Sequence, residues 1–393
     1  MNYEKTTIGL HCTVTSSKRF HASERTKDGV PFYCSKEIIK KVNGEKITEC
    51  DYISEDAYNR VKEEYGVPQA GDLLITTRGT YGIPYIYKEY DKFYFADGNL
   101  TWLKDFDDKL DAEYLYYWIN SYEGQKKIDA IAKGTAQKAV PIALLKEIEI
   151  VIPENPIQKK VVVILKNYDQ LIENNKKQIK LLEEAAQRLY KEWFIDLRFP
   201  GYENCKIVDG IPEKWERKKL VDIVDVQYGY AFDGSKFNSV GKGTPIIRIR
   251  NIPDGNTADF TTEEAEEKYV ISNGEILVGM DGEFHINSWS GKDAFLVQRT
   301  CCFRPRKREM KGWLLWAIYE PIKFYEKTVV GATVSHLGKK HIDSIELLTG
   351  PEQLYIPFQN YFELRQKLLN QNIVLAEARD RLLPKLMSGE IEV

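Results

Sequence analysis

Apolar residues recur at intervals of four and three along a long stretch in the middle of the chain, from Pro153 to Phe194. The stripe consists of Val161, Leu165, Tyr168, Ile172, Ile179, Leu182, Ala186, Leu189 and Trp193, with Asn175 intervening. An apolar repeat that averages 3.5 residues is typical of a coiled-coil helix, in which one seam faces a partner and a single Asn fixes the register. Charged and amide residues fill the other positions. The pattern therefore predicts a helix over 156–194, about 58 Å long, that needs a partner helix.

A second copy of this pattern occurs near the other end of the sequence, where 371–387 aligns with 178–194 without a gap. Two such helices can bury each other's stripes, so we expect an antiparallel coiled coil. The expected interface residues are Val161, Leu165, Tyr168, Ile172, Ile179, Leu182, Leu189, Tyr361, Leu368, Leu375 and Leu382. One edge of the second stripe carries Arg365, Asn372 and Arg379. Pro384 is expected to break the second helix late.

The region before the first long helix has the pattern of a globular α/β domain with many short strands. Residues 29–38, 71–87 and 92–104 alternate or run apolar between Gly, Asp and Asn, as strands do, and 140–153 contains one more strand. Helical spacing marks 54–66 and 111–134, and Gly134 is the expected C-cap of the latter.

The region after the first helix repeats the first region in the same order. The repeated pairs are 29–38 with 243–252, 71–81 with 274–284, and 134–150 with 331–347. Together with the repeated helix they indicate an internal duplication. The expected fold is α/β (α+β), with two similar domains joined by two long antiparallel coiled-coil helices about a pseudo-two-fold axis. Its expected parts are domains 1–152 and 198–350 and helices 153–197 and 351–393.

Composition is compatible with a large soluble protein. The 393 residues, 43% of them hydrophobic and 12% aromatic, suffice for two or three cores. No apolar run is long enough to span a bilayer, and the charged start of the sequence does not resemble a signal peptide, so a cytoplasmic location is expected. The six cysteines contain no CxxC pair, which favours free thiols over disulfides or a zinc site.

Motifs for catalysis are missing from the sequence. It contains no GxxxxGK[ST] loop for ATP, and neither a Gly-rich cofactor loop nor the Asn-Pro-Pro-aromatic tetrad of an adenine methyltransferase. The five histidines have no metal-binding spacing, and we expect His336 and His341 to face solvent or DNA phosphates. The isolated chain is therefore expected to be neither an enzyme nor a metal protein.

Specific motifs resemble the specificity subunit of type I restriction-modification systems. They are EIEIVIPENPIQKKVVVIL, which leads into the first helix, WFIDLRFPG at its end, the following GIPEKW, and the terminal LLPKLMSGEI. The resemblance covers the whole chain, although the first domain lacks the GIPEKW lead-in of the second. It implies a non-catalytic subunit with two target-recognition domains, each reading half of a bipartite double-stranded DNA sequence.

The same resemblance implies the partners. The helices are expected to bind two methyltransferase subunits, and restriction-translocase subunits join through that complex. S-adenosylmethionine, ATP and Mg²⁺ would belong to these partners, which carry out adenine methylation or restriction.

Candidate DNA-binding residues follow from the need for Arg, Lys, Asn or Gln at base edges and hydroxyls, Lys and amides at phosphates. They are Ser17, Lys18, Arg19, Arg78, Lys133, Thr135, Gln137 and Lys138 in the first domain and Tyr228, Tyr230, Lys236, Arg248, Arg250, Asn251, Thr333, Ser335, His336, Lys339 and Lys340 in the second. A lone Lys or Arg is more often a solvated surface charge, so their clustering at duplicated loops is the better argument. Asp281 replaces Arg78 in the repeat. Different half-sites would require such a difference, but an unused loop would also show it.

Two alternatives stay open at this point. The net charge of -3 argues weakly against a nucleic-acid partner. The chain could instead be a structural scaffold with two protein-binding modules on a coiled-coil strut, which the salt dependence of DNA binding would distinguish. It could also be a phase-variable or orphan copy without active partners.

Overall fold

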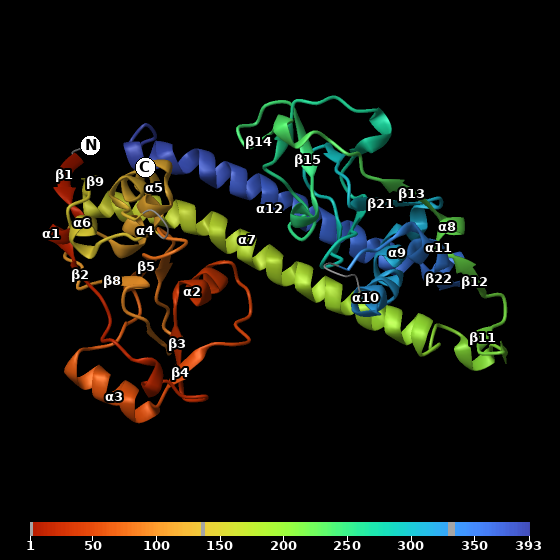
Figure 1. Cartoon of the computed structure of the whole chain (residues 1–393), viewed down its shortest axis with the longest axis horizontal. Helices are drawn as coiled ribbons and strands as arrows, with labels where there is room; N and C mark the ends of the chain where they lie inside the picture. The colour runs from red at the N-terminus through yellow and green to blue at the C-terminus, as the bar shows by residue number, and fades with distance from the viewer. Residues whose placement is uncertain (1–2, 135–137, 329–334) are drawn as a thin grey trace. The chain divides into compact units, whose positions relative to one another are not determined.

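The computed structural model describes residues 3–134, 138–328 and 335–393 (Figure 1). It divides into two compact units. The first unit comprises Met1–Gln170 and Ala376–Val393, and the second unit comprises Leu171–Leu375. Because α7 (Asn155–Tyr190) and α12 (Ile356–Ser388) each contribute residues to both units, the units are described one after the other.

The first unit combines short strands with helices. Its strands are β1 (Tyr3–Thr7), β2 (Thr13–Thr15), β3 (Val30–Tyr33), β4 (Asp51–Ile53), β5 (Leu73–Thr76), β6 (Pro84–Ile86), β7 (Tyr94–Phe95), β8 (Leu100–Lys104) and β9 (Glu149–Pro153). Its helices besides the long ones are α1 (Ile8–His11), α2 (Ser35–Val42), α3 (Glu55–Glu64), α4 (Ala112–Asn120), α5 (Tyr122–Ile131) and α6 (Ile142–Lys146). An antiparallel sheet has the order β2-β8-β5-β6, a second sheet has the order β4-β3-β7, and β1 pairs with β9.

Both faces of the first sheet of this unit are buried. Leu73 and Ile75 pack with Leu115 of α4 in one core, whereas Leu74 packs with Phe95 in another. Successive side chains of a strand point to opposite faces, so β5 joins the helical layer to the second sheet. The loops at the ends of these strands are therefore held by a core on each side.

The second unit contains the remaining elements. Its strands are β10 (Ile207–Val208), β11 (Ile211–Pro212), β12 (Glu216–Lys219), β13 (Val224–Tyr228), β14 (Phe237–Asn238), β15 (Thr244–Ile247), β16 (Phe260–Thr261), β17 (Val270–Ile271), β18 (Ile276–Gly279), β19 (Ile286–Ser288), β20 (Ala294–Leu296), β21 (Thr300–Pro305) and β22 (Glu346–Thr349). Its shorter helices are α8 (Leu220–Ile223), α9 (Lys311–Ala317), α10 (Tyr319–Thr328) and α11 (Lys339–Ser344).

Strand pairing confirms the duplication predicted from the sequence. The sheet β13-β21-β18-β19 repeats the order β2-β8-β5-β6, and β12 pairs with β22 as β1 pairs with β9. Within the sheet β14-β16-β15-β20-β17, strand β15 pairs parallel with β20, as β3 does with β7. Two globular regions with little identity therefore share one topology.

The sequence predicted a strand over the whole of 29–38 and over its repeat, 243–252. This prediction is wrong for the second half of each segment. Each strand turns into a helical segment at the same point. The amide of Cys34 donates to the Glu37 carboxylate at 2.9 Å, and the amide of Arg248 donates to the side-chain oxygen of Asn251 at 2.9 Å. These caps start α2 and the 3₁₀ turn Ile249–Asn251, because each satisfies an amide that the strand no longer pairs.

The helical pattern over 111–134 forms two helices, not the single one expected. The Ser121 hydroxyl donates to the carbonyl of Trp118 at 2.6 Å and accepts from the amide of Gly124 at 3.1 Å, so it ends α4 and caps α5. A Cβ on Gly124 would lie 2.1 Å from the Trp118 oxygen, which explains the glycine. The second helix ends at Ile131, before the expected cap Gly134.

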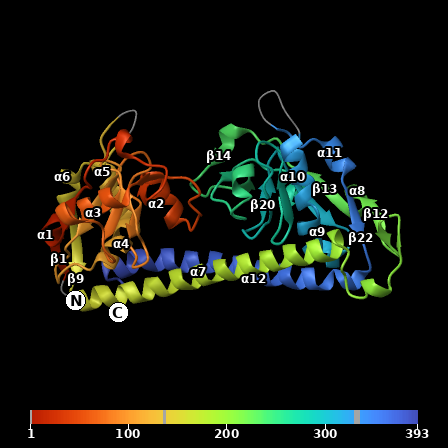
Figure 2. The same ribbon diagram turned by 90° about the horizontal axis from the view of Figure 1, so that it is seen from below.

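In the first unit, the start of α7 packs antiparallel against the end of α12 along one side of the globular part (Figure 2). Val161 and Leu165 are buried in the same core as Leu383. One turn further along α7, Asp169 pairs with Arg379 at 2.6 Å.

Pro384 does not end α12, which continues to Ser388 and corrects our expectation. Leu386 and Met387 are buried in the core of the first unit, and this anchoring outweighs the backbone hydrogen bond that proline removes. No helix of the described residues is long and apolar enough to cross a membrane.

In the second unit, the same two helices also run antiparallel. The Asn175 amide donates to Asn372 at 2.9 Å, and Glu183 pairs with Arg365 at 2.7 Å. A π-helical turn, Lys191–Ile195, follows α7. Of the expected interface residues of both units, Val161, Leu165, Ile179 and Leu368 are buried, and Tyr168, Ile172, Leu182, Leu189, Tyr361, Leu375 and Leu382 are half-buried.

Candidate nucleic-acid interface

Three segments of the first unit leave its β2-β8-β5-β6 sheet at the same end. Thr15 at the end of β2 pairs with Trp102, and Thr76 at the end of β5 pairs with Leu100, where β8 begins. We call this region the first loop end and define it as residues 16–19, 77–83, 97–99 and the described part of 133–139.

Backbone hydrogen bonds attach the segment after α5 to this loop end. Val140 N donates to Thr77 O at 2.9 Å, Gly79 N donates to Lys138 O at 3.4 Å, and Ala139 bridges to Arg78. Lys133 and Ala139 also exchange hydrogen bonds at 2.9 and 2.8 Å. These contacts bring the candidate Arg78 together with the candidates Lys133 and Lys138, which lie far from it in the sequence.

The side chains of these three cations are exposed, and within the described part of the chain none forms an ion pair or hydrogen bond. Uncompensated positive charges on neighbouring segments repel one another, and a polyanion removes that repulsion. The first loop end therefore has the charge that a phosphate backbone or a guanine edge requires. Thr135 and Gln137 lie outside the described residues.

The candidates Ser17, Lys18 and Arg19 are held by the same loop end. Lys18 N donates to the Tyr94 hydroxyl at 2.7 Å, and Arg19 Nε donates to Asp97 Oδ2 at 2.7 Å. The Ser17 hydroxyl is buried and has no hydrogen-bond partner among the described residues. Arg19 is thus neutralised by a neighbour, unlike Arg78.

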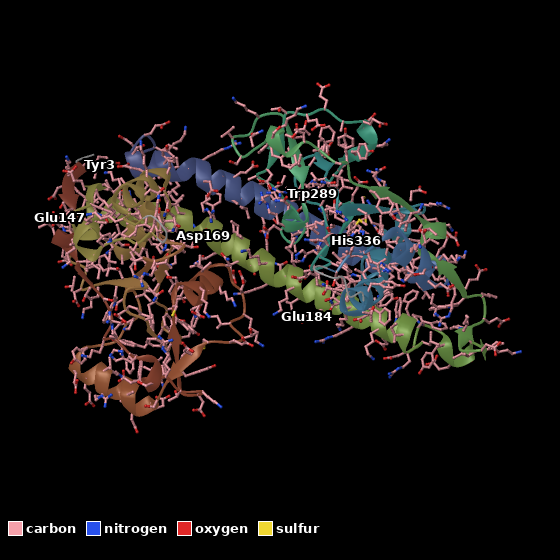
Figure 3. The ribbon with its side chains drawn as sticks, in the orientation of Figure 1. Tyr3, Glu147, Asp169, Glu184, Trp289 and His336 are labelled. Carbon is pink, nitrogen blue, oxygen red and sulfur yellow. The ribbon has the colours of Figure 1, made fainter. Side chains whose placement is uncertain are left out.

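The second unit has an equivalent region, the second loop end, made of residues 228–230, 280–285, 297–299 and 335–338. Tyr228 pairs with Cys301, and Gly279 pairs with Thr300. Leu337 N donates to Met280 O at 2.7 Å, Gly282 N donates to Ser335 O at 3.0 Å, and Met280 N donates to Arg299 O at 2.9 Å. Figure 3 labels His336 in this region.

A charged cluster occupies the second loop end. Asp281 Oδ1 lies 2.5 Å from His336 Nδ1, and its other oxygen lies 3.4 Å from Arg299 Nε. Arg299 Nη1 is 3.4 Å from the same histidine nitrogen. Arg299 was not among the residues predicted from the sequence, although aligning the residue before β8, Asn99, with the residue before β21 points to it.

Tyr228 and Tyr230 contribute aromatic surface beside this cluster. Burial raises the pKa of Tyr228 to about 12. Tyr230 packs on Phe232 and Tyr269, with ring centroids 4.8 and 5.1 Å apart. The Tyr230 ring is therefore held in place by two neighbouring rings.

Three other candidates follow β15 and are engaged within their own sheet. The Arg248 guanidinium lies 5.7 Å from the centroid of Phe237, and Arg250 pairs with Asp259 at 2.7 Å. Burial by itself would raise the pKa of Asp259, but the Arg250 guanidinium lowers it overall. With the Asn251 oxygen occupied by a backbone amide, these side chains have structural partners that the sequence did not reveal.

Of the remaining candidates, Lys236, Lys339 and Lys340 are exposed, and Thr333 lies outside the described residues. Lys339 and Lys340 begin α11, in which His341 Nδ1 accepts the Gly338 amide at 3.0 Å. No group of His, Cys, Asp and Glu within residues 3–134, 138–328 and 335–393 is arranged to hold a metal ion.

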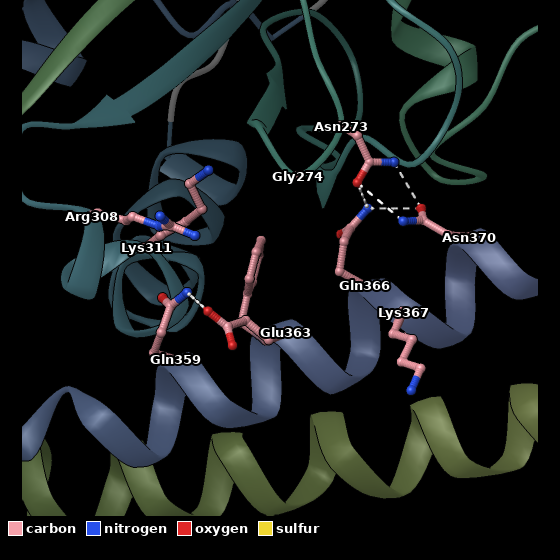
Figure 4. A pocket seen from close by; sticks show the side chains of 10 residues that line it. Asn273, Gly274, Arg308, Lys311, Gln359, Glu363, Gln366, Lys367 and Asn370 are labelled. Carbon is pink, nitrogen blue, oxygen red and sulfur yellow. Dashed lines mark hydrogen bonds between the residues drawn. The ribbon is translucent and has the colours of Figure 1, made fainter.

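A separate polar pocket of about 360 Å³ lies between α12 and the globular part of the second unit (Figure 4). Arg308, Lys311 and Lys367 line it. Gln366 Nε2 and Asn370 Nδ2 both donate to Asn273 Oδ1 at 3.2 Å. These bonds attach α12 to the globular part of the second unit, so we interpret the pocket as part of this structural contact and not as a binding site.

Comparisons with known proteins bear on both units. A family model described as Type I restriction modification DNA specificity domain matches residues 2–184 and 212–351. The chain is 28% identical over 346 residues to the type I restriction enzyme MjaIX specificity subunit of Methanocaldococcus jannaschii, a match that covers 82% of this chain and 78% of that protein. It is 26% identical over 311 residues to the MjaVIII specificity subunit of the same organism, covering 72% and 71%.

The fold also has a relative among solved structures. The crystal structure of the S subunit of a type I restriction-modification system from M. genitalium matches with a TM-score of 0.57 at 18% identity. The match covers 98% of this chain and 96% of that one, so the fold is shared over nearly the whole length.

Proposed function

The chain belongs to the type I restriction-modification DNA specificity family, and from this premise we propose that it reads a bipartite DNA target, one half-site with each unit. DNA target recognition is what the family implies. The division into two half-sites, and the direction of adenine methylation to the sites so chosen, are the finer parts of the proposal.

One observation carries the bipartite reading. The two loop ends have equivalent backbone connections but different side chains: Arg78 and Ala139 in the first stand where Asp281 and His336 stand in the second. Equivalent scaffolds give equivalent docking, whereas different donors and acceptors select different bases. A scaffold that bound one protein at two equivalent sites would have no use for this difference.

The helices support the proposed methyltransferase contact. In the first unit an apolar groove lies between α7 and α12 and includes Val163, Ile164, Leu382 and Leu386. Val163 is 56% exposed, and exposed apolar surface of this kind marks protein interfaces. Catalysis, S-adenosylmethionine, ATP and Mg²⁺ are assigned in this proposal to the methyltransferase and restriction-translocase partners.

Sequencing native DNA for methyladenine, in host cells with and without this gene, tests the proposal. We expect one bipartite motif to lose methylation when the gene is deleted. An unchanged methylome, or loss at a contiguous motif, would contradict it.

Binding of the purified complex with its methyltransferase subunits gives a second measurement. The affinity for a duplex that contains the motif identified by methylome sequencing should exceed the affinity for a scrambled duplex. Both affinities should fall steeply as the salt concentration rises. Equal affinity for the two duplexes would instead favour a complex without sequence recognition.

A further inference from the structure

The two loop ends can be aligned residue by residue through their backbone hydrogen bonds. Thr77 N donates to Asn99 O at 2.8 Å in the first unit, and Met280 N donates to Arg299 O at 2.9 Å in the second. Asn99 and Arg299 therefore occupy equivalent positions, each directly before the strand that follows.

This alignment reveals an exchange of charge. The first loop end has Arg78 after β5 and the neutral Asn99 before β8, whereas the second has Asp281 after β18 and Arg299 before β21. In the second unit the arginine therefore precedes the strand instead of following one, and an aspartate occupies the position that is equivalent to Arg78.

We propose that Arg299, oriented by Asp281, determines the specificity of the second half-site by contacting a guanine. This inference rests on the proposed function. Arginine is the residue best suited to guanine, because its guanidinium donates two parallel hydrogen bonds to O6 and N7.

The geometry leaves the guanidinium available. Its side chain is 57% exposed, and its two contacts are long: Nε lies 3.4 Å from Asp281 Oδ2, and Nη1 lies 3.4 Å from His336 Nδ1. A carboxylate on that edge limits the rotation of a long side chain, so less freedom is lost when the outer nitrogens meet a base. The closer contact of Asp281 is with His336, at 2.5 Å, and this contact in turn fixes the carboxylate.

The backbone of Arg299 is also unusual. Its φ is +68°, a left-handed conformation that asparagine tolerates better than most residues. Asparagine is thus an accommodating replacement at this position, and it copies the residue of the first unit. The test variant is accordingly Arg299→Asn, and Arg299→Lys keeps the charge but not the paired donors.

The matched control flanks the same strand, β21, at its other end. Arg306 follows β21 at the opposite end of the sheet, is 54% exposed and pairs with Asp225 at 3.1 Å. Arg306→Ala therefore removes an exposed, ion-paired arginine from the same unit without altering the second loop end.

The experiment measures affinities of the complex of this chain with its methyltransferase subunits for duplexes in which each base pair of the wild-type motif is changed in turn. In Arg299→Asn we expect the preference for guanine at one position of the second half-site to fall roughly 5- to 150-fold. The first half-site should be read as before, Arg299→Lys should lose part of the preference, and Arg306→Ala should match the wild type.

Two results would overturn the inference. One is an unchanged base preference in Arg299→Asn. The other is equal weakening on every duplex, which identifies a phosphate contact. If the wild-type complex itself shows no preference for any duplex, the proposed function fails, and the two failures are thereby distinguished.

Discussion

Replacing Arg365 with alanine should destabilise the second unit more than any other removal of a charge from α12. The side chain is only 8% exposed and pairs with Glu183 at 2.7 Å. It also donates to Ser288 Oγ at 2.7 Å and to Asn287 Oδ1 at 2.6 Å, both on β19. One arginine thus connects α12 to α7 and to the sheet that carries the second loop end.

The loss of stability in Arg365→Ala depends on how well the former partners of the arginine are satisfied without it. Breaking a buried ion pair by removing one partner costs about 3–5 kcal/mol. Glu183 is 33% exposed and can be rehydrated, and Ser288 keeps its bond to Gln366, so we take the lower end, about 3 kcal/mol. For a unit of this size about 2–4 °C is lost per kcal/mol, which gives a fall of roughly 6–12 °C in melting temperature.

Scanning calorimetry of the full chain measures this fall, and hydrogen exchange of peptides covering β18 and β19 assigns it to the second unit. The matched control is Arg381→Ala, since that arginine is on the same helix, is 80% exposed and lies 3.9 Å from Glu377. It should cost less than about 0.5 kcal/mol. A cost below about 1 kcal/mol for Arg365→Ala, or an equal cost for both variants, would refute the reasoning.

Three further predictions address recognition, pH and spacing. Arg78→Ala should relax recognition of the first half-site alone, by about 1–3 kcal/mol if it contacts a base edge. Methylome sequencing measures this effect, and a change at the second half-site would contradict the prediction. Burial by itself would raise the pKa of Asp259, but Arg250 lowers it overall to below 3.8, so the ion pair stabilises the fold at neutral pH and this contribution is lost as the pH falls through the lowered value; Asp259→Asn should therefore destabilise near neutral pH and cost progressively less as the pH is lowered, as denaturant titrations over that range would measure. Inserting four residues after Asn174 adds about 6 Å to the helix that leads from one unit into the other, so the same half-sites should be methylated with a gap longer by one or two base pairs of about 3.4 Å each, and an unchanged gap would show that α7 is not the spacer.

The sequence by itself determined the long-range organisation of this protein. The heptad stripe around Leu165 and Asn175 predicted a long helix with a partner, and the ordered repeats predicted two domains of one topology. These conclusions are local in origin, because a helix pattern is read from neighbours three and four residues apart and a duplication is read by aligning the chain with itself. The motifs WFIDLRFPG and LLPKLMSGEI added the family.

Only the tertiary structure decided which charged residues are available. Arg250 and Arg78 look alike in the sequence, yet one is neutralised by Asp259 and the other has no ion-pair partner among the described residues. The sequence did not indicate Arg299 as a candidate, because only the pairing of the strands places it beside Asp281.

Details of the elements were decided in the same way. The break at Ser121 and the continuation of α12 through Pro384 depend on a capping hydroxyl and on a buried anchor beyond the proline. The cap at Ser121 is a local contact that the helical spacing of 111–134 did not reveal. The buried anchor beyond Pro384 depends on packing against residues distant in sequence, and no periodicity along one chain encodes that packing.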